Sequence, residues 1–168
     1  MYRKPHPTTI SVLTDKISCS YANIPRSWGA HLFMIESFSL RTDSGGAGQF
    51  RGGLGFTRRY LMLAPCRIST RFERTKCPLW GINGGKEAEP GDVLIEAADE
   101  TTRSALKEAV MLNAGDRVRI HTGGGGGFGD PRLRDRDSVR TDLLRNYISP
   151  EAARTIYAFD EALELSQR

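Results

Sequence analysis

The distribution of glycine constrains this chain of 168 residues more than any other feature of its sequence. All but one of the 18 glycines lie between Gly45 and Gly129, and most gather in two runs, at residues 45–55 and 123–129. Glycine tolerates positive φ and close backbone approach, but it is entropically expensive to order in a helix. This density therefore predicts strands joined by tight turns, or loops that lie against another part of the polypeptide.

Hydrophobic periodicity predicts short strands around and between the glycine runs. Residues 66–72 alternate apolar and polar side chains, which is typical of a strand with one buried face. Further apolar stretches of strand length occur at five places: 34–40, 56–64, 92–96, 109–112 and 117–121. The last two are joined by the turn-forming residues 113–116, and we interpret them as a hairpin.

The chain changes character after Pro131, because no glycine follows it and helix-forming residues dominate. Asp135 or Asp137 is expected to cap a first helix. Residues 149–151, Ser-Pro-Glu, predict the start of a second helix, since serine caps helices, proline suits the first turn and an acid favours the helix N-terminus. The apolar stripes of the two helices are expected at Val139, Leu143, Leu144 and Tyr147, and at Ala153, Ile156, Tyr157 and Leu163.

Together these patterns predict an α+β protein: a β-rich domain of short, mostly antiparallel strands with glycine-rich loops, followed by a C-terminal helical hairpin. We place an N-terminal arm or partial element at 1–32, the β domain at 33–131 and the hairpin at 132–168. No apolar run approaches the roughly 20 residues that cross a bilayer, so no membrane association is expected. Three scattered cysteines without CxxC spacing indicate neither a disulfide framework nor a zinc ribbon, and we expect a reduced, cytoplasmic chain.

Two nucleotide-binding motifs are matched only superficially. Gly124, Gly126 and Gly129 satisfy GxGxxG, but five consecutive glycines make that match nearly automatic, and Asp130-Pro131 follows where a helix should open. Gly85-Lys86 lacks the Ser or Thr of a P-loop. The second glycine run could be a nest of backbone N–H groups that binds a carboxylate or phosphate. We favour the other interpretation, in which a neighbouring backbone packs closely against it.

Candidate catalytic sets are sparse. His6, His31 and His121 lie far apart and match no metal-binding pair, and the sequence contains no GxSxG elbow. Cys66 lies on the apolar face of its predicted strand, so we expect a buried, inert thiol, whereas Cys77 could be more reactive. His121 stands at the mouth of the second glycine run and could contact a ligand, but we prefer to interpret it as a half-exposed strand histidine.

The net charge of +4 raises the possibility of nucleic-acid binding. A basic cluster close to Phe72 and Trp80 is one signature of single-strand binding. The cluster consists of Arg67, Arg71, Arg74 and Lys76, with Arg58 and Arg59 on the preceding strand. No arginine-rich run, RNP motif or zinc finger accompanies it. We therefore favour a solvated strand face, or a surface that pairs with an acidic partner subunit, and keep nucleic-acid binding as the least favoured alternative.

Three stretches, in this order and spacing, resemble one protein family. Residues 43–55, DSGGAGQFRGGLG, resemble its DSGGAGxxRGGxG signature. Residues 73–86 resemble its Arg-rich, Pro-Trp-Gly, Gly-Gly-Lys segment, and residues 115–131 and 148–153 resemble its GDxVxxxTPGGGGYGDP and SPEAA ending. The family is the hydantoinase B/oxoprolinase group, which includes B-type subunits of N-methylhydantoinase, ATP-dependent lactamases and acetone or acetophenone carboxylases. The resemblance covers about residues 36–160.

This resemblance implies part of an ATP-dependent enzyme that phosphorylates a carbonyl and then hydrolyses a cyclic amide or carboxylates a ketone. B-type subunits are several times longer, and the chain resembles only their C-terminal end. In the family a divalent metal belongs to the upstream region, and ATP with Mg belongs to an A-type partner subunit. No cofactor is therefore expected on this chain, and no metal ligand can be carried over to it.

The resemblance thus implies a C-terminal segment or split subunit that is inactive alone. It would join an A-type ATP-binding subunit and the remainder of a B-type subunit in a hetero-oligomer. A non-catalytic binding or assembly module is the alternative. The candidate substrate or interface residues, whose individual roles are not assigned, are Asp43, Ser44, Gly45, Gly46, Arg51, Arg74, Trp80, Lys86, His121, Gly124, Gly125, Gly126, Gly127, Gly129 and Asp130.

Three positions depart from the family pattern. Gly123 and Phe128 stand where the family usually has Pro and Tyr, which implies a looser loop that lacks one hydroxyl. Cys77 occupies a position more often filled by Pro or another small residue.

Overall fold

The computed structural model describes residues 8–12, 17–21 and 32–160, which fall into two compact units. The first unit comprises the described residues up to 38 together with 58–73 and 92–120, and the second comprises 39–57, 74–91 and the residues from 121 onward. Most of the regular structure is antiparallel strand, and the few short helices come late in the chain. The predicted fold class, a β-rich α+β protein ending in helices, is confirmed.

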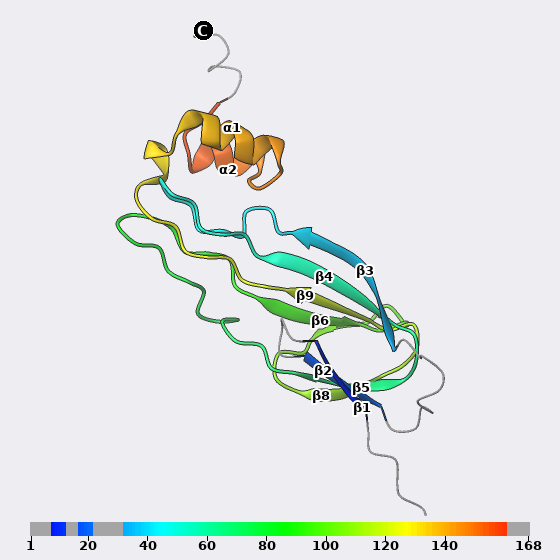
Figure 1. Ribbon diagram of the computed structural model, residues 1–168. Coiled ribbons are helices and arrows are strands. Elements are labelled where there is room, and N and C mark those ends of the chain that lie inside the picture. The colour runs from blue at the N-terminus through cyan, green and yellow to red at the C-terminus, as the bar shows by residue number, and fades with distance from the viewer. Residues whose placement is uncertain (1–7, 13–16, 22–31, 161–168) are drawn as a thin grey trace, which may run out of the picture. The chain divides into compact units, whose positions relative to one another are not determined.

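The strands form two sheets (Figure 1). One sheet has the order β1 (Thr8–Val12), β2 (Ile17–Tyr21), β5 (Cys66–Thr70) and β8 (Ala109–Leu112). The other has the order β3 (Phe33–Leu40), β4 (Phe56–Met62), β9 (Arg117–His121), β6 (Asp92–Glu96) and β7 (Thr102–Ser104). Pairing in the first sheet is antiparallel, with Cys66 opposite Leu112 and Cys19 opposite Ile68.

The core of the first unit lies between the two sheets, because alternate residues of β5, β6 and β9 turn inward. Cys66 and Ile68 of one sheet belong to the same buried cluster as Val93, Val118 and Ile120 of the other. The period of two predicted for residues 66–72 is present in β5, and the Cys66 thiol is buried as expected.

The predicted hairpin of residues 109–112 and 117–121 is wrong. β8 pairs with β5 in one sheet, whereas β9 lies between β4 and β6 in the other. The connection crosses between the sheets, with Gly115 at φ +94 and the Asp116 carboxylate accepting the backbone N–H groups of Asn113 and Ala98 at 2.7 and 3.0 Å. Both strands alternate because each turns one face to a shared core, and alternation alone does not distinguish a hairpin from an arch between two sheets.

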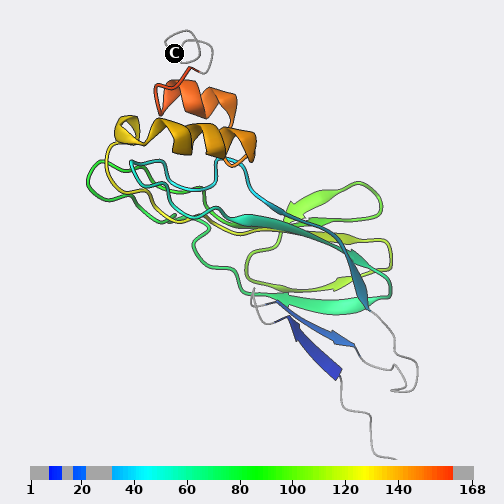
Figure 2. The ribbon, with the colours of Figure 1, turned by 45° about the horizontal axis from the view of Figure 1, so that its top comes forward.

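The second unit contains the helices, η2 (Pro131–Leu133), α1 (Arg136–Leu144) and α2 (Pro150–Thr155). Figure 2 shows α1 and α2 side by side. Asp135 caps α1 and Ser149 caps α2, each accepting a backbone N–H three residues ahead, as the sequence predicts. None of the helices in the described ranges is long and apolar enough to cross a membrane.

The buried faces of these helices differ in part from the predicted stripes. Leu144 is exposed, because it follows Val139 by five residues and so lies about 140° around the helix. Asp142, three residues after Val139, takes the buried position instead. Ile156 lies beyond the last residue of α2 and is also exposed. Val139, Ala153 and Tyr157 are buried and Leu143 partly so, while Leu163 falls outside the described residues.

Candidate functional site

The glycine-rich segments of the second unit pack directly on one another. We call residues 44–55, 79–91 and 122–130 the glycine bundle. Backbone hydrogen bonds join each pair of these segments: Gly46 N–H to Gly125 C=O at 2.8 Å, Ile82 N–H to Gly127 C=O at 2.9 Å, and Lys86 N–H to Ala47 C=O at 2.7 Å. The three segments therefore form one backbone-to-backbone assembly.

Most glycines of the bundle have no room for a side chain. A Cβ at Gly52 would lie 1.8 Å from the carbonyl oxygen of Gly125, and one at Gly127 would lie 2.1 Å from that of Ala47. Gly53, in contrast, has open space where its Cβ would be. This is the close backbone packing favoured from the sequence, and it explains why glycine is concentrated in these segments.

The backbone N–H groups of the second glycine run are engaged within the bundle. The donors and their carbonyl acceptors are Gly124 to Glu89, Gly125 to Gly53, Gly127 to Lys86 and Gly129 to Ile82, at 2.8 to 3.2 Å. A nest binds an anion through N–H groups that point outward together. Because these four already donate to the chain itself, the nest interpretation does not apply to them.

Ser44 is a structural residue of the bundle. It is fully buried, and its hydroxyl donates to the carbonyl of Arg41 at 2.6 Å while accepting the N–H of Gly55 at 2.9 Å. The Arg41 guanidinium donates in turn to the carbonyls of Pro90 and Thr122 at 2.9 and 2.7 Å. Ser44 thus fixes the two ends of the first glycine run together.

Asp43 links the bundle to the helices. Its carboxylate accepts the backbone N–H of Ser149, the cap of α2, at 2.8 Å, and its own N–H donates to the carbonyl of Tyr147 at 3.0 Å. Its φ of +60 lies in the left-handed region, which aspartate and asparagine tolerate better than other residues with a Cβ.

Substitution of Asp43 should separate the stability that comes from its carboxylate hydrogen bond from the stability that comes from its tolerance of positive φ. Asp43→Ala loses the acceptor and places alanine at positive φ, so we expect a loss of about 2 kcal/mol in the free energy of unfolding. Asp43→Asn keeps an acceptor oxygen and the tolerated φ, so its loss should stay below about 1 kcal/mol. Urea denaturation measures both. Equal losses in the two variants would contradict this assignment.

Arg51 belongs to a buried ion cluster. Its Nε lies 3.0 Å from Oδ2 of Asp142 and its Nη2 lies 3.2 Å from Oδ1, while Nη2 of Arg134 lies 2.9 Å from the same Oδ2. The guanidinium groups also donate to the carbonyls of Gly52 and Gln49, at 2.7 and 3.2 Å. The side chains are only 13, 6 and 13% exposed. One carboxylate therefore holds two arginines between α1 and the bundle.

Sequence reasoning missed Asp142 and Arg134. The only signal for Asp142 is an acid on the apolar stripe of a predicted helix, three residues after Val139. No local pattern indicates that Arg51, 91 residues away, is its partner.

Tyr157 lies in the apolar cluster of the second unit, with a hydroxyl that is buried and has no hydrogen-bond partner among the described residues. Burial disfavours the charged phenolate, and it raises the pKa of Tyr157 above its ordinary value. The ring is therefore a packing group whose polar atom contributes no hydrogen bond to the described fold.

Tyr157→Phe should consequently be neutral or stabilising, within about 1 kcal/mol. Tyr60→Phe is the matched control, because the buried Tyr60 hydroxyl accepts a hydrogen bond from Arg58 at 3.0 Å and its loss should cost about 1 kcal/mol.

The pH dependence of stability gives a second prediction for Tyr157. Because the unfolded chain releases the Tyr157 proton first, the stability of the wild type should fall as the pH rises above about 10, and Tyr157→Phe should reduce that fall. Urea titrations at several pH values test both statements. A clear loss of stability in Tyr157→Phe at neutral pH would refute them.

The remaining candidate residues occupy separate places in the second unit. Trp80 and Lys86 have exposed side chains on the bundle, and Arg74 is exposed with φ +58. The Asp130 carboxylate caps η2 by accepting the N–H of Arg132 at 2.9 Å. His121 is the last residue of β9 and is partly buried.

The basic cluster is divided between the two units, with Arg67 and Arg71 in the first and Arg74 and Lys76 in the second. Phe72 is buried in the core and cannot stack on a nucleobase. Arg59 is paired with Glu36 and Glu96, at 3.5 and 2.5 Å, and Arg119 is also paired with Glu96. These contacts favour the solvated strand face over nucleic-acid binding.

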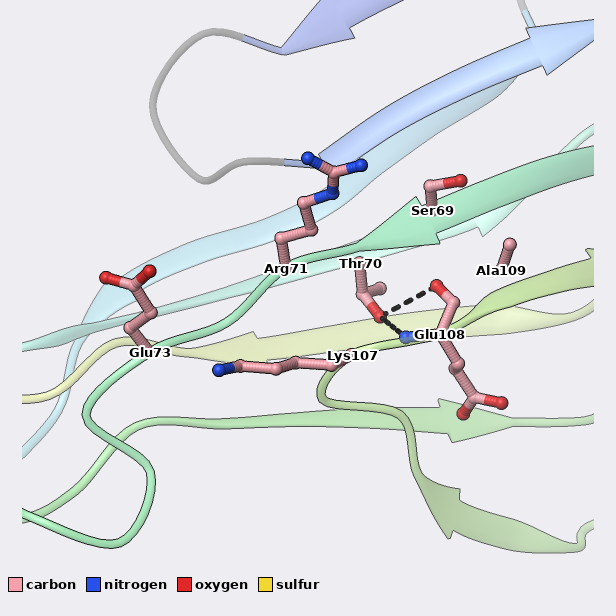
Figure 3. A pocket seen from close by; sticks show the side chains of 7 residues that line it. All are labelled: Ser69, Thr70, Arg71, Glu73, Lys107, Glu108 and Ala109. Carbon is pink, nitrogen blue, oxygen red and sulfur yellow. Dashed lines mark hydrogen bonds between the residues drawn. The ribbon is translucent and has the colours of Figure 1, made fainter.

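A polar hollow of about 400 Å³ lies in the first unit (Figure 3). Arg71 and Lys107 line it together with Glu73 and Glu108, and the Thr70 hydroxyl contacts the Glu108 backbone at 3.3 Å. The lining combines two bases with two acids, and it contains none of the candidate substrate or interface residues predicted from the sequence. Across the part of the chain that the structure describes, no three His, Cys, Asp or Glu side chains could hold a metal ion together.

The described fold combines two packed β-sheets with a glycine bundle, and Asp43 connects that bundle to the capped helix α2. It defines a class of protein region in which the residues of a glycine-rich sequence signature hold the backbone in place. The family model described as Hydantoinase B/oxoprolinase matches residues 31–131, and the chain belongs to this family. The resemblance noted from the three sequence stretches is thereby confirmed.

Three comparisons show how the chain relates to other members. It is 40% identical to the uncharacterized protein MJ0963 of Methanocaldococcus jannaschii over 71% of the chain and 21% of that protein. It is 32% identical to caprolactamase subunit beta of Pseudomonas jessenii over 74% of the chain and 22% of that subunit. The crystal structure of the ATP-dependent caprolactamase from the same organism matches with a TM-score of 0.63 and 26% identity, covering 79% of this chain and 24% of that one. The chain thus spans about a fifth of the length of these relatives.

Proposed function

We propose that the chain is the C-terminal segment or a split subunit of an ATP-dependent enzyme of the hydantoinase/5-oxoprolinase type, and that it is inactive alone. The reaction we propose for the whole enzyme is hydrolysis of a cyclic amide, with carboxylation of a ketone as the second possibility. The relative named as a caprolactamase subunit, together with the family match, supports an enzyme of this class. The chain's share of about a fifth of its relatives supports the role of a segment.

The observation that carries the proposal is that three side chains of the glycine-rich signature, residues 43–55, bind other parts of this same chain. Asp43 accepts the N–H of Ser149, the cap of α2, Ser44 joins the ends of a glycine run, and Arg51 is held by Asp142. All three act on the chain itself. They hold the glycine bundle in a fixed shape against which other polypeptide can pack.

We propose that the cofactors lie elsewhere in the assembly. ATP with Mg would be bound by an A-type partner subunit, and a divalent metal by the remainder of the B-type subunit. The residues described here do not offer a metal site, and no step of the reaction is assigned to them. Their part would be to shape the bundle and its exposed edges in a hetero-oligomer.

Activity measurements on the separate and combined chains test this proposal. The purified chain should release no phosphate from ATP in the presence of hydantoin, 5-oxoproline or caprolactam. Co-expression with an A-type subunit and an upstream B-type region should produce substrate-dependent release. Gly53→Ala should support the same release as wild type and serves as the matched control for bundle variants. Turnover by the lone chain would refute the proposal, and complex formation without turnover would support a non-catalytic assembly module instead.

A further inference from the structure

Three large apolar side chains stand in register across the glycine bundle. The backbone N–H and C=O groups of Phe128 exchange hydrogen bonds of 2.9 Å with those of Phe50, and a parallel bridge joins Phe128 to Ile82 on its other side. Residues directly opposite in a ladder point to the same face, so the three side chains form a line. The rings of Phe50 and Phe128 confirm this, with centroids 6.3 Å apart.

Trp80 stands two residues before Ile82 and is a fourth exposed apolar residue of the same segment of the bundle. We call Phe50, Trp80, Ile82 and Phe128 the apolar row. These residues are 64, 72, 53 and 43% exposed, in that order. Glycines of the bundle are packed against other backbone, for example Gly48 against Phe128 and Gly127 against Ala47. The bundle therefore has close contacts at its glycines and leaves these four aromatic and aliphatic side chains uncovered.

Neighbouring uncovered residues of this size and kind mark interaction sites. Aromatic side chains are enriched in the buried centres of protein interfaces. The row carries no acid, base or nucleophile, and these four residues are absent from the lining of the polar hollow in the first unit. Its chemistry fits a polypeptide surface better than a small polar substrate.

The identity of the docking partner follows from the part of the chain that the family model matches. All four residues lie within the matched span 31–131, so the row belongs to the part of the chain that is common to the family. The relatives carry nearly four-fifths of their length outside the matched stretch. Each of these two relatives therefore carries a large polypeptide in the same chain as the matched stretch.

We propose that the apolar row is the surface on which the remainder of a B-type polypeptide docks. This inference rests on the proposed function, because it supplies the contact through which the segment joins its enzyme. It commits to a folded polypeptide of the same family, in preference to a second copy of this chain or a small molecule.

A full-length chimera provides the test. The matched stretch of the Pseudomonas jessenii caprolactamase subunit beta is replaced by the corresponding residues of this chain. Hydroxyl-radical footprinting then follows oxidation of Phe50, Trp80 and Phe128 by mass spectrometry. These side chains should react several-fold more slowly in the chimera than in the isolated chain. Equal reactivity in both proteins would overturn the proposal, and so would concentration-dependent protection in the isolated chain, which would identify a second copy as the occupant.

Substitution in the same two proteins gives a second readout. Phe50→Gln should lower the melting temperature of the chimera by about 5 °C and leave that of the isolated chain nearly unchanged, because the residue is buried only in the chimera. Glu87→Gln, an exposed bundle residue outside the row, should change neither. A similar effect of Phe50→Gln in both proteins would contradict docking at the row.

A crosslinking experiment covers the case in which the chimera does not fold. Benzoylphenylalanine is placed at position 82 or 87 of this chain, which is co-expressed with the caprolactamase subunit lacking the matched stretch. Crosslinks to that subunit from position 82, and few or none from 87, would support docking. Crosslinks from 82 only within or between copies of this chain would overturn it. Because footprinting and crosslinking do not require turnover, an inactive chimera with a protected row would reject the proposed function and leave this inference standing.

Discussion

Gly52→Ala should unfold the glycine bundle, whereas the same substitution at the adjacent Gly53 should leave the protein as stable as before. At Gly52 the new methyl group would lie 1.8 Å from the Gly125 carbonyl oxygen and 2.5 Å from its carbon, both of them backbone atoms. Backbone cannot move aside as a flexible side chain can, so we expect a loss of about 3 kcal/mol or more in the free energy of unfolding. Urea denaturation followed by circular dichroism would measure it.

Gly53→Ala is the matched control, because nothing lies within 4 Å of its Cβ position and its φ is not in the left-handed region. Alanine also reduces the entropy of the unfolded chain, so this variant should equal the wild type or exceed it by about 0.5 kcal/mol. If the two variants lose similar stability, the second unit does not have the packing described here.

Asp142→Asn should have the second large effect. The substitution removes the negative charge that holds Arg51 and Arg134, at 3.0 and 2.9 Å, in a place where all three side chains are nearly buried. Removing one partner of a buried ion pair leaves the others uncompensated, and we expect a loss of about 3 kcal/mol in unfolding free energy. Thermal and urea unfolding should both show the change.

Asp137→Asn, on the same helix, is the control. Asp137 contacts Arg140 at 2.6 Å, but its side chain is 73% exposed, and an exposed pair of this kind contributes less than about 0.5 kcal/mol. A double variant, Asp142→Leu with Arg51→Met, should be less destabilised than Asp142→Asn despite losing more hydrogen bonds, because it buries one fewer unpaired charge. The opposite order would show that the cluster does not act through its charges.

The parts of the fold that local patterns determine could be predicted from the sequence. β5 follows the alternation of residues 66–72, and Ser149 caps α2 because serine, proline and glutamate stand in the order that a helix N-terminus favours. The close packing of the glycine segments is likewise predictable, because a high local density of glycine indicates backbone contact.

The parts that depend on partners distant in sequence could not be predicted. The pairing of β8 with β5, and not with β9, is decided by which sheet each strand joins. The buried Asp142 and the register that aligns Phe50 with Phe128 likewise depend on residues 91 and 78 positions away. The periodicity of one sequence shows which face of a strand or helix is apolar. It does not show which other element packs against that face.

The crowding of backbone around the bundle glycines also has a genetic consequence. Every missense change of a glycine codon adds at least one carbon to Cα, and at Gly45, Gly46, Gly52, Gly124, Gly126 and Gly127 the nearest atom to that carbon would be 1.8 to 2.5 Å away. A gene that retains this fold can therefore drift at these codons only through synonymous bases. In a saturation library of the chain, these six positions should be almost empty among folded clones, and codon 53 should be well populated.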